Sequence, residues 1–209
     1  MKALILVDLQ NDFMPGGALA VREGDAVVPI ANRLMPCFDL VVATQDWHPA
    51  DHLSFASQHP ESRAGDVTQL EDLQQVLWPD HCVQATTGSE LHRDLNISGI
   101  HRVIPKGTDR SIDSYSGFFD NGHKQGTGLA EYLKQHKVTE VYIMGLATDY
   151  CVKFTALDAI SLGLTTYLIE DGCRGVELQA GDIESTLVEL RWAGVRMTNS
   201  KEILASHSS

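Results

Sequence analysis

The chain has 209 residues, of which 43% are hydrophobic and 21% are charged. This profile is typical of a folded globular protein and excludes a disordered, collagen-like or fibrous chain. Acidic residues outnumber basic residues 28 to 16. The resulting net charge of −12 argues against nucleic acid and anionic membrane as partners, because both require a positively charged face.

Six short runs rich in Val, Ile and Leu are predicted to be strands, at residues 3–7, 40–44, 102–104, 140–144, 165–169 and 195–198. Four segments between them are predicted to be helices, at residues 26–37, 128–136, 149–162 and 179–193. Continuous apolar strands that alternate with helices indicate a three-layer α/β/α sandwich with a central, mainly parallel sheet. We expect a single domain over residues 1–209, and the spacing leaves the strand order open.

The first apolar run ends at Asp8, so it is too short for a signal peptide, and no later run approaches the ~18–20 residues that span a bilayer. The four cysteines, at positions 37, 82, 151 and 173, form no C-x-x-C pair. We therefore expect free thiols in a reducing compartment, and a cytoplasmic protein.

Residues 45–101 interrupt the alternation of strands and helices. This stretch is rich in His, Asp, Gln, Ser and Pro and shows little clean periodicity. An irregular insertion of this length in a compact domain is usually functional or disordered. Its aromatic, His and Pro residues favour an ordered, functional loop.

Ligands of parallel α/β sheets bind beyond the carboxyl ends of the strands. Asp8 and Lys106 each follow a predicted strand, and Cys151 lies at the predicted start of a helix with Thr148 or Asp149 as its N-cap. A cysteine in a first helical turn can form a stabilised thiolate, with Asp8 as general acid and base and Lys106 as the cation beside it. The alternative for each residue is structural: a buried thiol, a carboxylate bonded to a loop, and a surface lysine.

The insertion contains Asp46, His48 and His52, followed about thirty residues later by His81. Asp46 and His48 are two residues apart and point the same way in an extended chain. One carboxylate and two imidazoles suit a divalent transition metal, with His52 as a fourth ligand or an outer contact. The alternative is a set of unrelated surface histidines. Aromatic residues near these groups, Phe13, Trp78 and Tyr115 among them, would suit a flat aromatic substrate or ordinary core packing.

These motifs resemble the nicotinamidases of the isochorismatase-like cysteine hydrolase superfamily. The matching segments run in consistent order at residues 6–13, 44–49, 52–55, 78–83, 106–107, 113–116, 145–152 and 171–175. The Asp8, Lys106 and Cys151 motifs alone are typical of the whole superfamily. The D-x-H motif at Asp46 and the W-P-x-H-C motif around His81 together resemble the motifs of the nicotinamidase branch.

The resemblance implies an enzyme that deamidates nicotinamide to nicotinate and ammonia in NAD salvage, with pyrazinamide as a further substrate. It implies Asp8, Lys106 and Cys151 as the catalytic triad, and the backbone N–H groups of Ala147 and Cys151 as the oxyanion hole. It also implies a cis peptide between Leu146 and Ala147. Other positions carried over are a substrate pocket at Phe13, Trp78 and Tyr115, and one divalent metal on Asp46, His48 and His81.

The resemblance favours zinc as the metal, with iron and manganese also found in the family, and leaves a homo-oligomer open. Three alternative hypotheses about the function remain. In the first, a metal-bound hydroxide attacks directly and Cys151 is structural. In the second, the reaction is isochorismate hydrolysis or hydrolysis of another amide, and the Asp and His set argues against isochorismate hydrolysis. The third is a binding module without activity.

Overall fold

The structure, a computed structural model, describes residues 1–70 and 72–207. Its centre is a six-stranded sheet in the order β5-β2-β1-β6-β7-β8, and every neighbouring pair is parallel. The strands are β1 (Lys2–Val7), β2 (Leu40–Asp46), β5 (Arg102–Lys106), β6 (Glu140–Leu146), β7 (Thr165–Arg174) and β8 (Arg196–Thr198). All six predicted strands are present.

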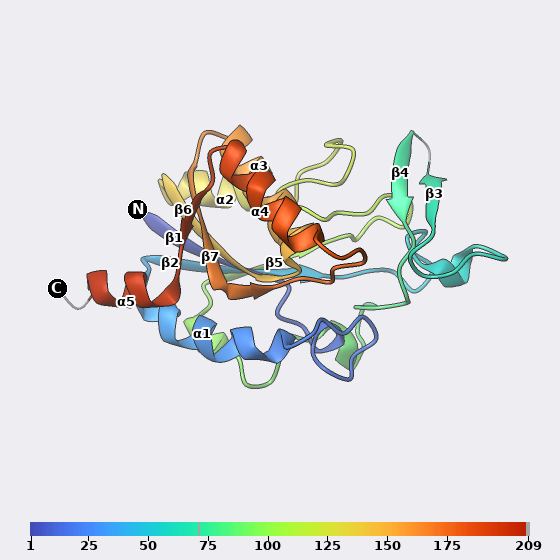
Figure 1. Cartoon of the computed structure of the whole chain (residues 1–209), viewed down its shortest axis with the longest axis horizontal. Coiled ribbons are helices and arrows are strands. Elements are labelled where there is room, and N and C mark those ends of the chain that lie inside the picture. Colours follow the sequence, from blue (N-terminus) through green and yellow to red (C-terminus); the bar gives the residue numbers. More distant parts are fainter. Residues whose placement is uncertain (71, 208–209) are drawn as a thin grey trace.

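Helices cover both faces of the sheet. They are α1 (Val27–Leu34), α2 (Leu129–Gln135), α3 (Lys153–Ser161), α4 (Asp182–Trp192) and α5 (Ser200–His207). Figure 1 shows α1 and α5 on one side of the sheet and α2, α3 and α4 on the other. The chain moves from β1 to β2 in one direction and from β6 to β8 in the other, so right-handed crossovers place helices on opposite faces. The predicted three-layer α/β/α sandwich is confirmed.

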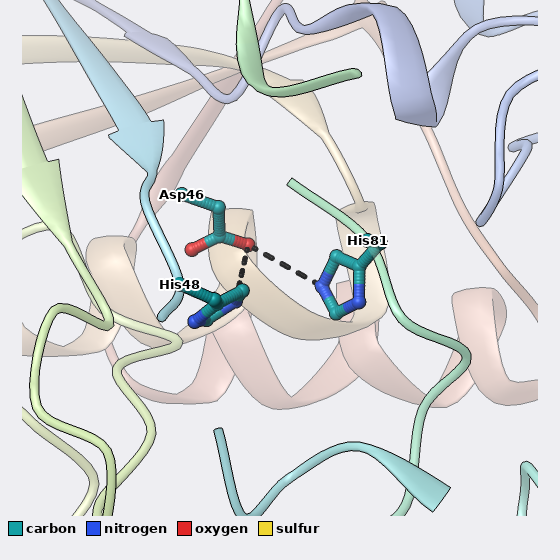
Figure 2. Close-up of side chains that lie close together, drawn as sticks. All are labelled: Asp46, His48 and His81. Atoms are coloured by element: carbon teal, nitrogen blue, oxygen red, sulfur yellow. Dashed lines mark ion pairs between the residues drawn. The ribbon is translucent and has the colours of Figure 1, made fainter. Parts of the chain in front are cut away.

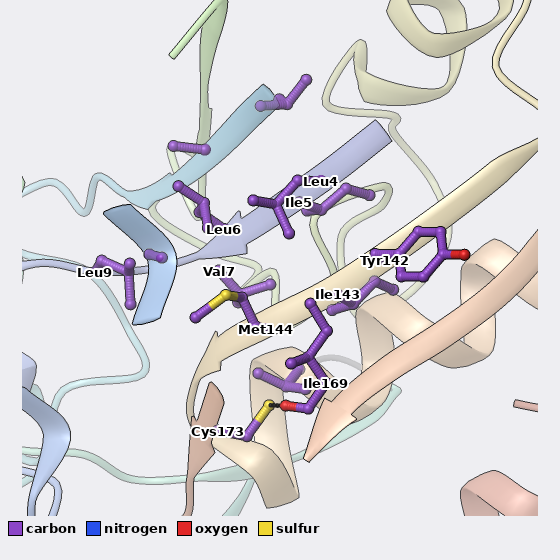
Figure 3. Close-up of a cluster of buried hydrophobic side chains, with 14 of the residues drawn as sticks. Leu4, Ile5, Leu6, Val7, Leu9, Tyr142, Ile143, Met144, Ile169 and Cys173 are labelled. Carbon is purple, nitrogen blue, oxygen red and sulfur yellow. Dashed lines mark hydrogen bonds between the residues drawn. The ribbon is translucent and has the colours of Figure 1, made fainter. Parts of the chain in front are cut away.

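The core lies on both sides of β1. This strand pairs with β2 and β6, and its residues 3–7 are completely buried. A strand that is covered on both faces needs apolar residues at every position, which explains its continuous rather than alternating pattern. Figure 3 shows its side chains packed with those of β6 and β7, including Ile143, Met144 and Ile169. Burial of each such side chain stabilises the fold by about 1.5–3 kcal/mol.

Several features differ from the sequence prediction. Strands β2 and β5 each run two residues further than predicted, so Asp46 and Lys106 end their strands instead of following them. The terminal helix α5 was missed because only Ile203 of its eight residues is a buried apolar residue. The insertion contains an antiparallel hairpin, β3 (Val67–Leu70) and β4 (Leu73–Val76), whose polar Gln and Thr residues gave no strand signal.

Within the described ranges 1–70 and 72–207, no helix is both long and apolar enough to cross a membrane.

Candidate active site

Three charged side chains meet at the carboxyl edge of the sheet. Asp46 and Lys106 are the last residues of β2 and β5 and are direct register partners. Asp8 directly follows β1, the other neighbour of β2, in a left-handed backbone conformation with φ of 52°. Aspartate is among the residues that tolerate this conformation. The parallel register therefore brings together residues that are up to 98 positions apart.

The ammonium group of Lys106 is the centre of this cluster. The residue is only 1% exposed, and its Nζ lies 2.9 Å from Asp8 Oδ2 and 2.5 Å from Asp46 Oδ1. It also donates to the carbonyl oxygen of Ser114 at 2.9 Å and lies 3.4 Å from Cys151 Sγ. Burial lowers the pKa of Lys106, but the carboxylates of Asp46 and Asp8 outweigh burial and hold this pKa well above its ordinary value. Lys106 is therefore a permanent buried cation.

Asp8 is held at both carboxylate oxygens. Thr44 donates its hydroxyl to Asp8 Oδ1 at 2.6 Å, while Oδ2 faces Lys106. Burial raises the pKa of Asp8, and Lys106 and the Thr44 hydroxyl oppose that rise. The net pKa is about 6, which is close to neutral pH and suits a group that must both take and return a proton.

The pKa of the Asp46 carboxyl moves in the other direction. Burial raises this pKa, but Lys106 and then His48 outweigh burial and hold it well below its ordinary value. Two neighbouring carboxylates thus differ in role: Asp46 stays ionised, while Asp8 can exchange a proton.

Cys151 lies in a π-helical turn, η7 (Thr148–Val152), that leads into α3. The prediction that Thr148 or Asp149 caps this helix is wrong. The N-cap position belongs to Ala147, and the Asp149 carboxylate instead accepts hydrogen bonds from the backbone N–H groups of Val176 and Glu177. Cys151 is nonetheless at the first turn, and it lies at the wall of a pocket with only 8% of its surface exposed.

Burial raises the pKa of the Cys151 thiol well above its ordinary value, and Lys106 opposes this rise only in part. The thiolate stabilisation expected from the helix start does not outweigh burial, so a base would be needed to take the proton from the sulfur. Ligand atoms of Cys151, Asp8 and Asp46 lie within 4.8 Å of one another, so a carboxylate that could accept this proton is adjacent. The peptide between Leu146 and Ala147 is cis, as the resemblance implies, and Ala147 lines the same pocket as Cys151.

Beside this cluster, Asp46, His48 and His81 point their ligand atoms at one another (Figure 2). Asp46 Oδ2 lies 3.6 Å from His48 Nε2 and 3.8 Å from His81 Nε2. His48 Nδ1 forms a hydrogen bond with the carbonyl oxygen of Gly107, and His81 Nδ1 forms one with the carbonyl oxygen of Pro79. A carbonyl only accepts, so each neutral ring has its proton on Nδ1 and a free lone pair on Nε2.

This donor set fits a divalent transition metal. His48 Nε2 is buried without a hydrogen-bond partner, as expected for an atom that binds a metal. The backbone carbonyls behind both imidazoles fix the tautomer that a ligand needs, which is the usual outer support of metal-binding histidines.

His52 is placed differently. The centroid of its ring lies 4.5 Å from that of His48. Its ligand atom lies within 4.8 Å of ligand atoms of His48 and Asp113, and it does not form such a group with Asp46 and His81. Its Nδ1 accepts a hydrogen bond from the backbone N–H of Ser54, so the neutral ring has its proton on Nε2. Burial lowers the pKa of His52 and keeps the ring neutral. His52 Nε2 is, like His48 Nε2, buried without a hydrogen-bond partner, but it does not group with Asp46 and His81, and this geometry supports an outer contact over a fourth ligand.

A pocket joins the two clusters. Of the residues named from the sequence, its walls contain Phe13, Asp46, Trp78, His81, Tyr115, Ala147 and Cys151. Asp8, Lys106 and His48 lie behind those walls. Sequence reasoning missed four further lining residues, Leu19, Asp113, Tyr150 and Val176. Tyr150 and Asp113 lie within quoted motifs and could have been found there, whereas Leu19 and Val176 carry no sequence signal.

The isochorismatase domain matches residues 2–202 of the chain. The nicotinamidase of Escherichia coli is 51% identical over 203 residues, covering 94% of this chain and 93% of that protein. The chain belongs to the isochorismatase family. The resemblance to the nicotinamidase branch is confirmed.

Solved isochorismatase-family structures are also similar. The Acinetobacter baumanii nicotinamidase and pyrazinamidase superposes with a TM-score of 0.94 at 45% identity, over 97% of both chains. The Pyrococcus horikoshii pyrazinamidase, solved in complex with zinc, has a TM-score of 0.76 at 39% identity and covers 95% of this chain and 98% of that one.

Proposed function

We propose that this enzyme hydrolyses nicotinamide to nicotinate and ammonia through a thioester on Cys151. The observation that carries the proposal is the contact of Lys106 with Asp8, Asp46 and Cys151 at once, beside a pocket with aromatic walls. A structural cysteine would not require a buried base and a buried ammonium next to its sulfur.

The residues present can perform each step. Asp8 takes the proton from the Cys151 thiol, and the sulfur attacks the amide carbonyl to form a C–S bond. The backbone N–H groups of Ala147 and Cys151 hold the negative oxygen that develops. Asp8 then gives its proton to the amide nitrogen, the C–N bond breaks, and ammonia leaves a thioester.

Asp8 completes the cycle as a base. It takes a proton from water, whose oxygen attacks the thioester carbonyl, and the C–S bond breaks. The proton returns to Cys151 and nicotinate is released. Lys106 keeps Asp8 ionised at the start of both half-reactions, because its ammonium opposes the rise in the pKa of Asp8 that burial causes.

Asp46, His48 and His81 would hold one divalent metal, for which we propose zinc. When bound, the metal offers a Lewis-acid position for the ring nitrogen of the substrate. Phe13, Trp78 and Tyr115 supply flat apolar walls for the ring. Pyrazinamide has the same ring geometry and a nitrogen at the equivalent position, so we propose it as a second substrate. The product nicotinate would enter pyridine nucleotide synthesis.

The test is an ammonia-release assay on nicotinamide with the purified enzyme, before chelation, after chelation and after metal is restored. We expect Cys151→Ala to abolish turnover while metal stays bound, and Cys173→Ala to serve as the control for a buried thiol at the same edge. Acid quenching followed by mass spectrometry should trap the thioester in the wild type. Substantial activity in a metal-loaded Cys151→Ala variant would instead support attack by a metal-bound hydroxide.

A further inference from the structure

The β3–β4 hairpin stands apart from the six-stranded sheet (Figure 1). Neighbouring residues of a strand point to opposite faces, and on β4 Gln74 is exposed while Gln75 is only 3% exposed. A polar side chain buried this deeply needs partners, and the partners of Gln75 lie in the wall of the candidate active site.

The Gln75 amide joins the hairpin to residues 113–121. The two hydrogens on its Nε2 face three acceptors, the carbonyl of Val76 at 2.7 Å, Tyr115 Oη at 2.9 Å and Asp113 Oδ2 at 3.2 Å, so one hydrogen is shared between two of them. Its Oε1 accepts from Asn121 Nδ2 at 3.5 Å. Both Asp113 and Tyr115 line the pocket that contains Cys151. The hairpin therefore reaches the substrate pocket through this one side chain.

Tyr115 lines two spaces. It is part of the wall of the substrate pocket and also part of the wall of a second cavity of about 210 Å³ beside Gln74 and Phe154. A protein cavity of about 150 Å³ accommodates benzene, so the second cavity has room for an aromatic ring that swings out of the pocket wall.

Contacts with Gln75, Trp78 and Phe154 oppose that movement. Gln75 Nε2 and Trp78 Nε1 both donate to the phenol oxygen, Trp78 at 3.1 Å, and so occupy both of its lone pairs. The Tyr115 ring also stacks on Phe154, with 5.4 Å between centroids and 28° between planes. Trp78 and Phe154 each hold one part of Tyr115, whereas Gln75 holds both Tyr115 and Asp113.

We propose that Gln75 is a positioning residue, which fixes Tyr115 and Asp113 in the pocket wall and so sets the affinity for the ring of the amide substrate. This inference rests on the proposed function. Gln75 does not touch the reacting atoms, so its loss affects binding of the ring much more than the chemistry at Cys151.

The test compares Gln75→Met with Gln74→Met in the metal-loaded enzyme. Methionine keeps the length of the side chain and removes its hydrogen bonds, and Gln74 is the exposed neighbour on the same strand. We expect Gln75→Met to raise KM for nicotinamide about tenfold, equivalent to about 1.4 kcal/mol. We expect kcat to stay within about threefold, in keeping with an interaction made equally in ground and transition states. Gln74→Met should match the wild type.

A double-mutant cycle with Tyr115→Phe distinguishes positioning of the Tyr115 ring from a general destabilisation of the pocket wall. If Gln75 acts through the phenol oxygen, its replacement changes KM much less when that oxygen is already absent. The rate at which iodoacetamide alkylates Cys151 should be unchanged by Gln75→Met, because the nucleophile and its base are intact. If Gln75→Met does not fold, Gln75→Glu replaces it; its carboxylate faces Asp113 and should raise KM further.

Two results would overturn the inference in an active enzyme. One is a KM for a folded Gln75 variant that equals that of Gln74→Met, and the other is full additivity with Tyr115→Phe. Because both are ratios within one assay, they leave the proposed function untouched. Failure of the wild type to release ammonia from nicotinamide would overturn the function instead.

Discussion

Replacement of Lys106 by methionine is the sharpest test of the electrostatics at this site. The substitution keeps most of the apolar stem and removes an ammonium that lies 2.9 Å from Asp8 and 2.5 Å from Asp46. It leaves two buried carboxylates without the cation between them. Removal of one partner of a buried ion pair costs about 3–5 kcal/mol.

The pKa of Asp8 gives the expected size of the kinetic effect. This pKa is about 6 with Lys106 present. At pH 7 such a carboxyl is ionised in about nine of ten molecules. A loss of about 3 kcal/mol raises a pKa by about two units, since one unit corresponds to about 1.4 kcal/mol. The ionised fraction at pH 7 then falls to about one in ten.

The assay is the pH dependence of kcat/KM for ammonia release, whose acid limb reports ionisation of the base in the free enzyme. Activity requires ionised Asp8, so a higher pKa moves this limb to higher pH. We expect a limb near pH 6 in the wild type and about two units higher in Lys106→Met, with partial recovery of rate at alkaline pH. Lys134→Met, on the exposed face of α2, is the matched control.

An acid limb that stays near pH 6 in a folded, metal-loaded Lys106→Met enzyme would refute this reasoning. It would mean that another group keeps Asp8 ionised, or that the limb belongs to a different residue. If the methionine variant does not fold, Lys106→Arg keeps the charge and should leave the limb nearly in place while it lowers kcat, because the planar guanidinium cannot reproduce the contacts of a compact ammonium.

The remaining predictions concern the metal ligands and the base. Asp46→Ala and His48→Ala should each lose bound metal, and full metal content by elemental analysis in both would refute the ligand assignment. His52→Gln should keep one metal per chain, whereas loss of metal would make His52 a ligand. Thr44→Val removes the hydrogen bond to Asp8 Oδ1, so the acid limb of kcat/KM should rise by about one unit while Thr44→Ser stays near the wild type; identical profiles for the two variants would contradict this role.

The fold could be predicted from the sequence because each buried strand is a continuous apolar run. Much of the site could also be predicted, because Asp8, Asp46 and Lys106 lie where such runs end and parallel strands end at one edge of the sheet. The positions of these residues required no knowledge of strand order. Their pairing did: only the register of β2 with β5 places Asp46 opposite Lys106.

Other features depend on tertiary contacts that no local pattern records. Asp149 was a reasonable helix cap by residue type, but its carboxylate is used to hold the loop at Val176, a pocket residue from beyond β7. Gln75 lies in the short strand β4, whose sequence is LQQV, and its role depends entirely on the side chains that it contacts. The roles of Asp149 and Gln75 can be recognised only once the structure shows which groups they contact.

The buried charges link the base to the metal site. Asp8 and Asp46 are buried carboxylates that share one buried ammonium, that of Lys106. One ammonium cannot balance two ionised carboxylates, and an uncompensated buried charge is costly. A divalent cation held by Asp46 would supply the missing positive charge. The cation would bind the Asp46 carboxylate, which Lys106 also contacts. Lys106 and the cation would therefore together set the pKa of Asp8, and with it the ability of Asp8 to take the proton from Cys151.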